Sequence, residues 1–559
     1  MVRGAVIGAS VALVAYLVLV PAAFLVWQSF HGPATAAEAA RFTFEHYRAA
    51  WSGSDTPRLV ANSLRFAIGA SLFAFAVGTV LAFINERCDM PQKRLFFMLS
   101  IVPLVIPGVL FVIAWILLGS PKIGLVNLLL QAMMRTDHVF VDVYTLAGMA
   151  FVEGLHYSPL AFLLMSAAFR AMDPSLEEAA LASGATAWSV AWHITFRLAW
   201  PAAFATFMIL FVRSLESFEV PALLGLPAGI PVVTSAIYAS VHRYPGDVGV
   251  AAAYAVALVA IMGAGMWFQS RLTARGGRHA TVTGKAYRPR PLDLGRWRCA
   301  ALALFVVYLS LLVALPFLVL LWSSFQTFYA VPSIAALRNL TLDPYRSVLA
   351  FPAIARATVN SIALSIGTAT TVMLVTSVIA WIVVRTRVRG RSLLDHLASL
   401  PIVLPGLVLG LALMVFYLHV DIGIYGTLWI LFVAYVTRFL PYGMRYNSAS
   451  MIGIHRELEE SAAVSGASWW ATFRYIIVPL LRPGWIAGWI YIAIVSVREL
   501  SSSILLYSPG TEVLSVVLWE LWENGQYVEL CALGVLMTLA LLAIAIVARP
   551  AAERIAKAL

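Results

Sequence analysis

Charge is scarce in this chain of 559 residues, because Asp, Glu, Lys and Arg together make up only 12% of it. Soluble globular proteins carry about 25% of these residues. Hydrophobic residues reach 61%, and the mean hydropathy is +0.88. So few charges could not cover the surface of a water-soluble protein of this size, and the same numbers exclude a disordered chain. The composition predicts an all-α protein that crosses a membrane many times.

Motifs for catalysis or metal binding are also lacking. The three cysteines form no CxxC pair, so neither a disulfide framework nor a metal site is indicated. The nearest approach to a phosphate-binding loop is Gly284-Lys285, but His279 stands where that motif needs its first glycine. HExxH and GxSxG are absent. We therefore expect no catalytic residue, no metal ligand and no cofactor in this chain.

Twelve segments are long and apolar enough to cross a bilayer, which takes about 20 residues of helix. They lie at 5–29, 59–84, 95–118, 144–169, 202–221, 249–268, 299–322, 357–384, 395–419, 427–447, 484–505 and 528–548. The first could be a signal peptide, but its apolar run exceeds the usual core of about 7–15 residues. A similar segment recurs in mid-chain, so we expect it to be retained.

The net charge of +11 is informative through its distribution. Most Lys and Arg residues between the segments fall in alternate loops, and basic loops stay on the cytoplasmic side. We therefore expect both termini in the cytoplasm, with the lipid bilayer and no nucleic acid as a partner.

An internal duplication divides the chain. Tyr47-Arg48 recurs as Tyr345-Arg346, and Asn62-Ser63 recurs as Asn360-Ser361 at the same separation. The run Pro103-Leu-Val-Ile-Pro-Gly has its counterpart at Pro401-Ile-Val-Leu-Pro-Gly. We predict two homologous six-helix halves, 1–268 and 299–559, joined by a cytoplasmic linker at 269–298.

Two cytoplasmic loops repeat a common pattern, and we call them the first coupling loop (173–201) and the second coupling loop (455–483). Each predicts a short helix with acidic residues in its first turn, a glycine that ends the helix, and a second helix. The alternative is a helix lying on the lipid headgroups. The same spacing in both copies favours paired contact with a two-fold partner. The residues concerned are Glu178, Ala179, Ala180, Gly184 and Ala185 in the first loop, and Glu460, Ser461, Ala462, Gly466, Ala467 and Pro479 in the second.

Both coupling loops resemble the EAA motif of permeases of type I binding-protein-dependent ABC importers. The second copy fits throughout, with Ser461 in place of the middle alanine, and the first copy departs at Arg197, where the motif has proline. The resemblance implies that the chain fuses both permease halves in the type I fold. It also implies that two separate ATPase subunits bind the loops and that a periplasmic binding protein delivers the substrate across a bacterial inner membrane.

Charged residues inside two of the expected spans are costly, at about 2.5–3.5 kcal/mol each on insertion scales. In the repeat, Glu216 aligns with Arg498, so opposite charges would face each other across the two halves, and His156 aligns with Arg438. These groups either fix the halves together or line a gate. The candidates are Arg213, Glu216, Glu219, Arg438, Arg498 and Glu499.

The segments 217–227 and 499–509 make the chain most similar to the ferric iron permeases. Thiamine, polyamine and phosphonate importers have similar layouts. An ion-coupled secondary transporter, which also has twelve spans in two halves, is the alternative from another class.

Overall fold

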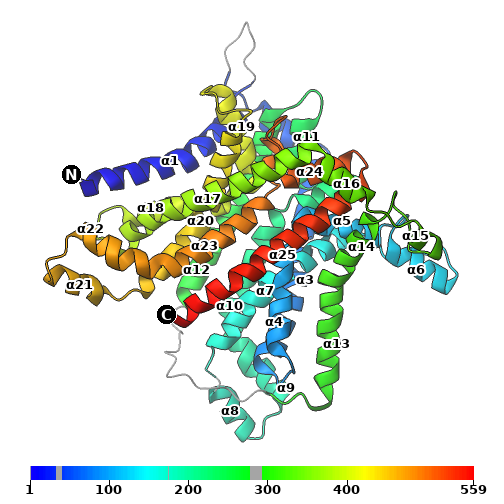
Figure 1. The fold of residues 1–559 in the computed structure, drawn as a ribbon, viewed down its shortest axis with the longest axis horizontal. Helices are drawn as coiled ribbons and strands as arrows, with labels where there is room; N and C mark the ends of the chain where they lie inside the picture. Colours follow the sequence, from blue (N-terminus) through cyan, green and yellow to red (C-terminus); the bar gives the residue numbers. More distant parts are fainter. Residues whose placement is uncertain (1, 33–40, 174, 277–291, 559) are drawn as a thin grey trace. The chain divides into compact units, whose positions relative to one another are not determined.

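The structure is a computed structural model that describes residues 2–32, 41–173, 175–276 and 292–558. These residues are mainly helical, and the only β pairing among them is two isolated bridges, His31 with Phe42 and Cys88 with Leu292. The all-α expectation is therefore confirmed (Figure 1). Part of the expected linker, 277–291, lies outside the described residues.

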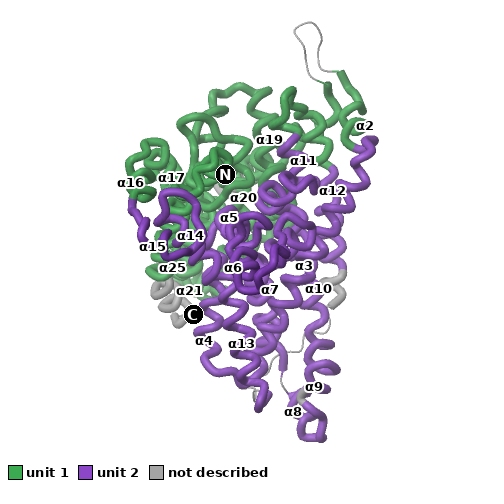
Figure 2. Tube along the Cα trace, turned by 90° about the vertical axis from the view of Figure 1, so that its right-hand side faces the viewer, with its two compact units in different colours: residues 1–50, 240–256, 343–559 green, residues 51–239, 257–342 purple. Residues whose placement is uncertain are grey.

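The chain forms two compact units, which are coloured separately in Figure 2. Unit 1 comprises residues 1–50, 240–256 and 343–559, and unit 2 comprises residues 51–239 and 257–342. Three helices cross a boundary between the units: α2 (Glu45–Trp51), α11 (Val233–His242) and α12 (Val248–Gly276).

The other helices fall within one unit. Those of unit 1 are α1 (Val2–Ser29), α16 (Asp343–Ala350), α17 (Pro352–Arg385), α18 (Arg391–Ser399), α19 (Gly406–His419), α20 (Leu428–Gly453), α21 (Arg456–Val464), α22 (Trp469–Thr472), α23 (Val478–Val497), α24 (Leu514–Glu523) and α25 (Tyr527–Ala558). Those of unit 2 are α3 (Thr56–Arg87), α4 (Lys93–Ile101), α5 (Gly108–Gly119), α6 (Leu125–Met134), α7 (Leu146–Ala171), α8 (Ser175–Ala182), α9 (Ala187–Val190), α10 (Phe196–Leu215), α13 (Arg298–Leu309), α14 (Leu315–Ser324) and α15 (Ile334–Arg338).

The first helix of each sequence half packs within the unit of the other half. In unit 1, α1 packs on α17, α18 and α19, and the hydroxyls of Tyr16 and Tyr417 lie 3.0 Å apart. In unit 2, α13 and α14 pack on α4 and α5, and the hydroxyls of Tyr308 and Ser158 lie 3.1 Å apart. The helices that begin each sequence half therefore belong to the compact unit that is built mainly from the other half.

Long helices pack closely where small residues meet. A Cβ on Gly154 of α7 would lie 2.7 Å from the carbonyl oxygen of Ala70 on α3, and one on Gly443 of α20 would lie 2.6 Å from the Thr376 hydroxyl on α17. Such contacts are typical of helices in membranes, where close van der Waals packing drives association. The pairs α3–α7 and α17–α20 thus form the centre of each unit.

Eight helical segments of the described chain are long and apolar enough to cross a membrane. They are Ile7–Ser29, Thr56–Arg87, Trp188–Leu215, Val248–Arg271, Gly295–Ser324, Pro352–Arg385, Trp470–Val497 and Tyr527–Val547. Two bent pairs raise this number to ten if each is one span. The remaining two expected spans are α7 and α20, which have 26 residues each but are not among the apolar segments.

Four of the expected spans have different shapes from those predicted. The segments at 95–118 and 395–419 bend by 100° and 105°, each just before a Pro-Gly pair. The spans expected at 202–221 and 484–505 instead run over Trp188–Leu215 and Trp470–Val497. Pro201 and Pro483 lie inside these helices rather than before them, since membrane helices tolerate proline where neighbours satisfy the freed carbonyl. The predicted linker at 269–298 begins too early, because α12 continues to Gly276.

Candidate coupling loops and charged helix breaks

Both coupling loops end their first helix in the same turn. In the first loop the Ala185 amide donates to the Ala180 carbonyl at 3.0 Å, and Gly184 between them has φ +86°. In the second loop the Ala467 amide donates to the Ala462 carbonyl at 3.0 Å, and Gly466 has φ +79°. This six-to-one bond around a left-handed residue is the Schellman motif. The expected helix, glycine turn and second helix are therefore present in both copies.

Apolar side chains are exposed at matching positions of the two loops. Leu176 and Leu458 occupy the same place in the repeat, and both are exposed. The same holds for Trp188 and Trp470. Among the motif residues, Ala179, Gly184, Glu460, Ser461, Gly466, Ala467 and Pro479 are exposed, Glu178, Ala180 and Ala185 are half-buried, and Ala462 is buried. Each loop thus presents a small-residue turn flanked by apolar side chains.

The second helix of each coupling loop continues into a long helix through a π turn. Residues Ala191–Thr195 form this turn before α10, and Phe473–Ile477 form it before α23. Pro479 lies in the first turn of α23, and Arg197 occupies the matching position in α10. Both long helices continue through this position, and both have a π turn directly before it. The departure of the first copy at Arg197 therefore leaves the helix intact.

An ion pair that the sequence analysis missed holds the first coupling loop to α3. The Arg87 guanidinium lies 3.3 Å from the Glu177 carboxylate, and both side chains are less than a tenth exposed. Arg87 also donates to the Met172 carbonyl at the end of α7, and Thr195 donates to Glu177 at 2.7 Å. Helix α8 of the first coupling loop is thereby joined to three other helical segments.

The second coupling loop has the equivalent ion pair. Arg385 lies 3.2 Å from the Glu459 carboxylate and donates to the carbonyls of Met451 and Ile454 at the end of α20. The repeat contained the signal, because Arg385 is as far from Arg87 as Asn360-Ser361 is from Asn62-Ser63. Glu177 and Glu459 directly precede the motif glutamates Glu178 and Glu460, so the motif by itself does not mark them.

The charged residues of the expected spans lie where helices end. Arg213 is in the last turn of α10, and Glu216 caps it and forms an ion pair with Arg213. Arg498 caps α23, with Glu499 next to it. A cation near a helix C-terminus is favoured by the helix dipole. Glu216 and Arg498 belong to different units, so their pairing across the halves stays a prediction.

Glu499 is held from several sides within unit 1. Its carboxylate lies 2.9 Å from Arg438 Nε and accepts hydrogen bonds from the Ser502 amide and hydroxyl. Its carbonyl accepts from Ser515 at 2.6 Å. These partners compensate the buried charge at the break after α23. The Arg438–Glu499 ion pair lies within the second half, so whether these charged residues fix the two halves together or line a gate stays a prediction.

The corresponding break in unit 2 is built from other residues. A Cβ on Gly108 would lie 3.5 Å from the Glu219 carboxylate and 3.7 Å from His156 Nε2. Nearby on α7, Glu153 is 3% exposed, and its Oε1 has no hydrogen-bond partner. The sequence analysis missed Glu153, which lies inside a span with no counterpart charge in the repeat.

The repeated Asn-Ser pairs hold the segment that follows each break. Asn62 donates to the Pro231 carbonyl at 3.2 Å, and Ser63 accepts from the Val233 amide at 2.9 Å. In the other half, Asn360 and Ser361 bind the segment before α24 in the same way. Within each unit, these side chains fix a loop near the N-terminal end of α3 or α17. The coupling loop is held by the arginine at the C-terminal end of the same helix.

The sequence matches the family described as "Binding-protein-dependent transport system inner membrane component" twice, over residues 73–276 and 373–559. The "Ferric transport system permease protein FbpB" of Actinobacillus pleuropneumoniae is 25% identical over 504 residues, which cover 87% of this chain and 70% of the relative. The "Putative ferric transport system permease protein FbpB 1" of Haemophilus influenzae is 25% identical over 467 residues, covering 82% and 72%.

Shorter matches include the "Putative 2-aminoethylphosphonate transport system permease protein PhnV" of Salmonella typhimurium, which is 28% identical over 172 residues, covering 31% of this chain and 63% of the relative. Among solved structures, a chain of a bacterial ABC transporter involved in the import of the acidic polysaccharide alginate is 18% identical, with a TM-score of 0.39. That match covers 46% of this chain and 96% of the other.

Proposed function

Because the chain belongs to the family of inner membrane components of binding-protein-dependent transport systems, we propose that it carries both translocating halves of one ATP-driven importer. The family matches each half once, which supports a fused permease. The chain is a multi-pass membrane protein and a transport subunit, and no covalent chemistry takes place on it.

The observation that carries this proposal is the pair of identical turns in the coupling loops. Each exposes a leucine before its glycine turn and a tryptophan after it, at matching positions. A two-fold ATPase dimer offers two equal surfaces to such a pair. We infer that one ATPase subunit binds each loop and that ATP is held on those subunits, with no cofactor on this chain.

The distribution of Lys and Arg among the loops supports a cytoplasmic position for the coupling loops and for both termini. The segments held by the Asn-Ser pairs then face the opposite side, where a periplasmic binding protein delivers the substrate. The ion pairs Arg87–Glu177 and Arg385–Glu459 carry movement of α8 and α21 into the long helices α3 and α17.

We propose ferric iron as the substrate. Two curated relatives that span most of this chain are named for ferric transport, and the phosphonate relative matches less than a third of it. Uptake of radiolabelled ferric iron by cells lacking this chain, with and without a plasmid copy, tests the assignment. 2-Aminoethylphosphonate and spermidine uptake, measured in the same cells, are the competing outcomes.

The ATPase interface is tested by cross-linking. A chain with Cys299 replaced, and with Ala179→Cys or Val464→Cys introduced, is expected to capture an ATPase subunit at each exposed site. Ile422→Cys, exposed in the loop between α19 and α20, is the matched control and is expected to capture none. Equal capture at Ile422, or none at Ala179 and Val464, would refute the assembly.

A further inference from the structure

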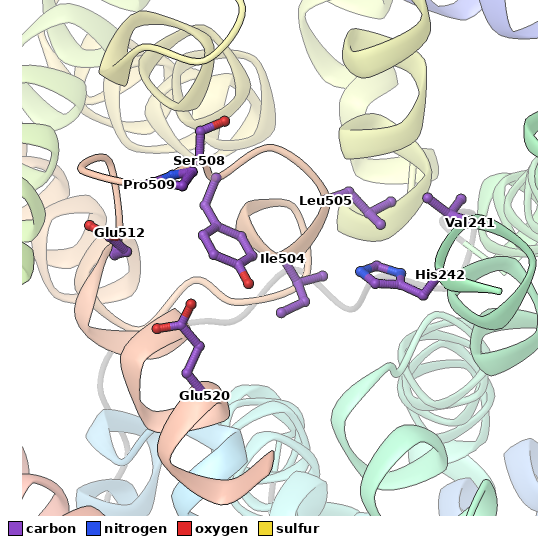
Figure 3. A pocket seen from close by; sticks show the side chains of 9 residues that line it. Val241, His242, Ile504, Leu505, Ser508, Pro509, Glu512 and Glu520 are labelled. Atoms are coloured by element: carbon purple, nitrogen blue, oxygen red, sulfur yellow. The ribbon is translucent and has the colours of Figure 1, made fainter. Parts of the chain in front are cut away.

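A pocket of about 390 Å³ opens within unit 1, lined by the segment between α23 and α24, by Glu520 of α24 and by Val241 and His242 at the end of α11. Its apolar wall includes Ile504 and Leu505, and its polar groups are His242, Tyr507, Glu512 and Glu520. Figure 3 shows Glu512 and Glu520 on the same side of the pocket, with His242 across from them. By the charge distribution of the loops, this segment faces the side on which a binding protein docks.

The oxygen donors on one side of the pocket are arranged around Tyr507. Its side chain is hydrogen-bonded to the Glu520 carboxylate. Burial, followed by the nearby negative charges, raises the pKa of Tyr507 to about 12. Burial also raises the pKa of Glu520, and the charges of Glu512 and Glu523 add to that effect. A cation entering here would relieve the repulsion among these carboxylates.

The carboxylate of Glu512 is an independent observation that points to a cation. One of its carboxylate oxygens, Oε1, accepts a hydrogen bond from the Gly510 amide at 2.8 Å. The other, Oε2, is buried and has no hydrogen-bond partner. A buried carboxylate oxygen without a partner costs desolvation energy that a bound cation would recover.

The loop that carries Glu512 is fixed before any ligand arrives. Asn360 on α17 donates to the carbonyls of Gly510 and Glu512, the latter at 2.9 Å, and Ser361 accepts from the Leu514 amide at 2.8 Å. Held in this way, the carboxylate stays in place when the pocket is empty. A preorganised donor loses little entropy when it binds a ligand.

The corresponding segment of the first half carries no such donors. Gly225 stands at the position of Tyr507, and residues 227–233 read Pro-Ala-Gly-Ile-Pro-Val-Val where the second half has Pro-Gly-Thr-Glu-Val-Leu. The Asn-Ser pair that fixes the loop is present in both halves, whereas the phenol and the carboxylates are present in one. The polar pocket is therefore specific to the second half, although both halves have the Asn-Ser pair that holds the loop.

We propose that Tyr507, Glu512 and Glu520 form an entry site that takes ferric iron from the binding protein. Phenolate and carboxylate oxygens are hard donors that suit a small, highly charged cation. The site rests on the proposed function, since it names where that substrate first meets this chain. Among the described residues no three His, Cys, Asp or Glu side chains are grouped to hold a metal. The proposed site therefore depends on the phenol of Tyr507 as its third donor. Three donors leave coordination positions open, which allows the ion to leave again.

Ferric iron bound by a phenolate absorbs visible light through charge transfer, so Tyr507 has its own spectroscopic signal. The complex of this chain with its ATPase subunits, in lipid nanodiscs, is titrated with ferric nitrilotriacetate. We expect a visible band that disappears in Tyr507→Phe and weakens in Glu512→Gln and Glu520→Gln. The same variants are expected to lower ferric uptake in cells.

The matched controls are Tyr425→Phe and Asp421→Asn, at an exposed tyrosine and an exposed acid of unit 1 that do not line the pocket. Both are expected to keep the band and the uptake. Thermal midpoint and ATPase content are measured for every variant, so that misfolding is recognised.

The outcomes separate the site from the function. If wild-type cells take up ferric iron but Tyr507→Phe cells do so equally well, the entry site is wrong and the proposed function stands. If wild-type cells take up none, ferric iron is not the substrate, and both the ferric assignment and the entry site are wrong. A wild-type band that survives in Tyr507→Phe, or that spermidine abolishes as well as a ferric chelator does, overturns the ferric assignment of the pocket.

Discussion

The two halves of the chain agree at the coupling loops and differ where the helices break and in the pocket. The turns at Gly184 and Gly466 have the same hydrogen bond, and both loops are attached by an arginine from a long helix. At the breaks, His156 and Ser217 stand where the other half has Arg438 and Glu499. This difference is what the proposed assembly requires, because a surface that meets two copies of one partner must be duplicated, whereas the surroundings of a single substrate need not be.

The strongest test of this comparison changes the shared turn. Gly184→Val and Gly466→Val each place a β-branched residue at positive φ, which disfavours the left-handed conformation by roughly 1–2 kcal/mol or more and destroys the turn. We expect either substitution alone to abolish ferric uptake and ATPase binding at its loop, because both loops are required. Uptake and co-purification measure this.

Gly453→Ala is the matched control, because Gly453 ends α20 close to the second loop with ordinary φ and open space around it. It is expected to behave as wild type. If Gly184→Val were tolerated while Gly466→Val were not, the two loops would be unequal in function despite their equal geometry.

The second test compares the two ion pairs. Glu177→Ala leaves Arg87 buried without its carboxylate, and breaking a buried pair in this way costs about 3–5 kcal/mol. Glu459 is 26% exposed, and Arg385 retains two carbonyl acceptors, so Glu459→Ala is expected to cost less. Thermal unfolding in detergent should rank the two variants in this order.

A double variant distinguishes stability from coupling. Arg87→Met with Glu177→Leu replaces the pair by apolar side chains of similar size, which is often neutral for stability. We expect the thermal midpoint to recover while ATP-driven uptake stays reduced, since α8 is no longer tied to α3 by charge. Full recovery of uptake would show that the ion pair serves stability alone.

The coupling loops could be predicted from the sequence because their signals are local. A glycine at a fixed distance after an acidic first turn specifies the end of a helix, and two copies remove most of the ambiguity. The helix breaks could not be predicted in this way, because Arg213 and Arg498 lie in apolar runs that hydropathy joins into one span. The partners of Arg87 and Glu499 depend on packing between distant helices, and the exchange of α1 and α13 has no local signal.

The third test makes the two helix breaks alike. Arg438→His introduces the residue of the first half and leaves the buried Glu499 without its ion-pair partner. An uncompensated buried carboxylate is expected to cost about 1–3 kcal/mol, because its serine hydrogen bonds remain. The double variant Arg438→His with Glu499→Ser removes that charge and should regain part of the loss in thermal unfolding. A double variant less stable than Arg438→His would mean that Glu499 stabilises the break through its serine contacts.

The smallest expected effect concerns the Asn-Ser pairs that both halves share. Asn360→Ala loses bonds to two carbonyls and Asn62→Ala loses one, and each neutral bond contributes about 0.5–1.5 kcal/mol. Asn360→Ala should therefore lower the thermal midpoint slightly more. It should also weaken the ferric band, because it frees the loop of Glu512, whereas Asn62→Ala should leave the band unchanged. Equal loss of the band in both variants would mean that the first half contributes to the metal site, contrary to the asymmetry between the halves.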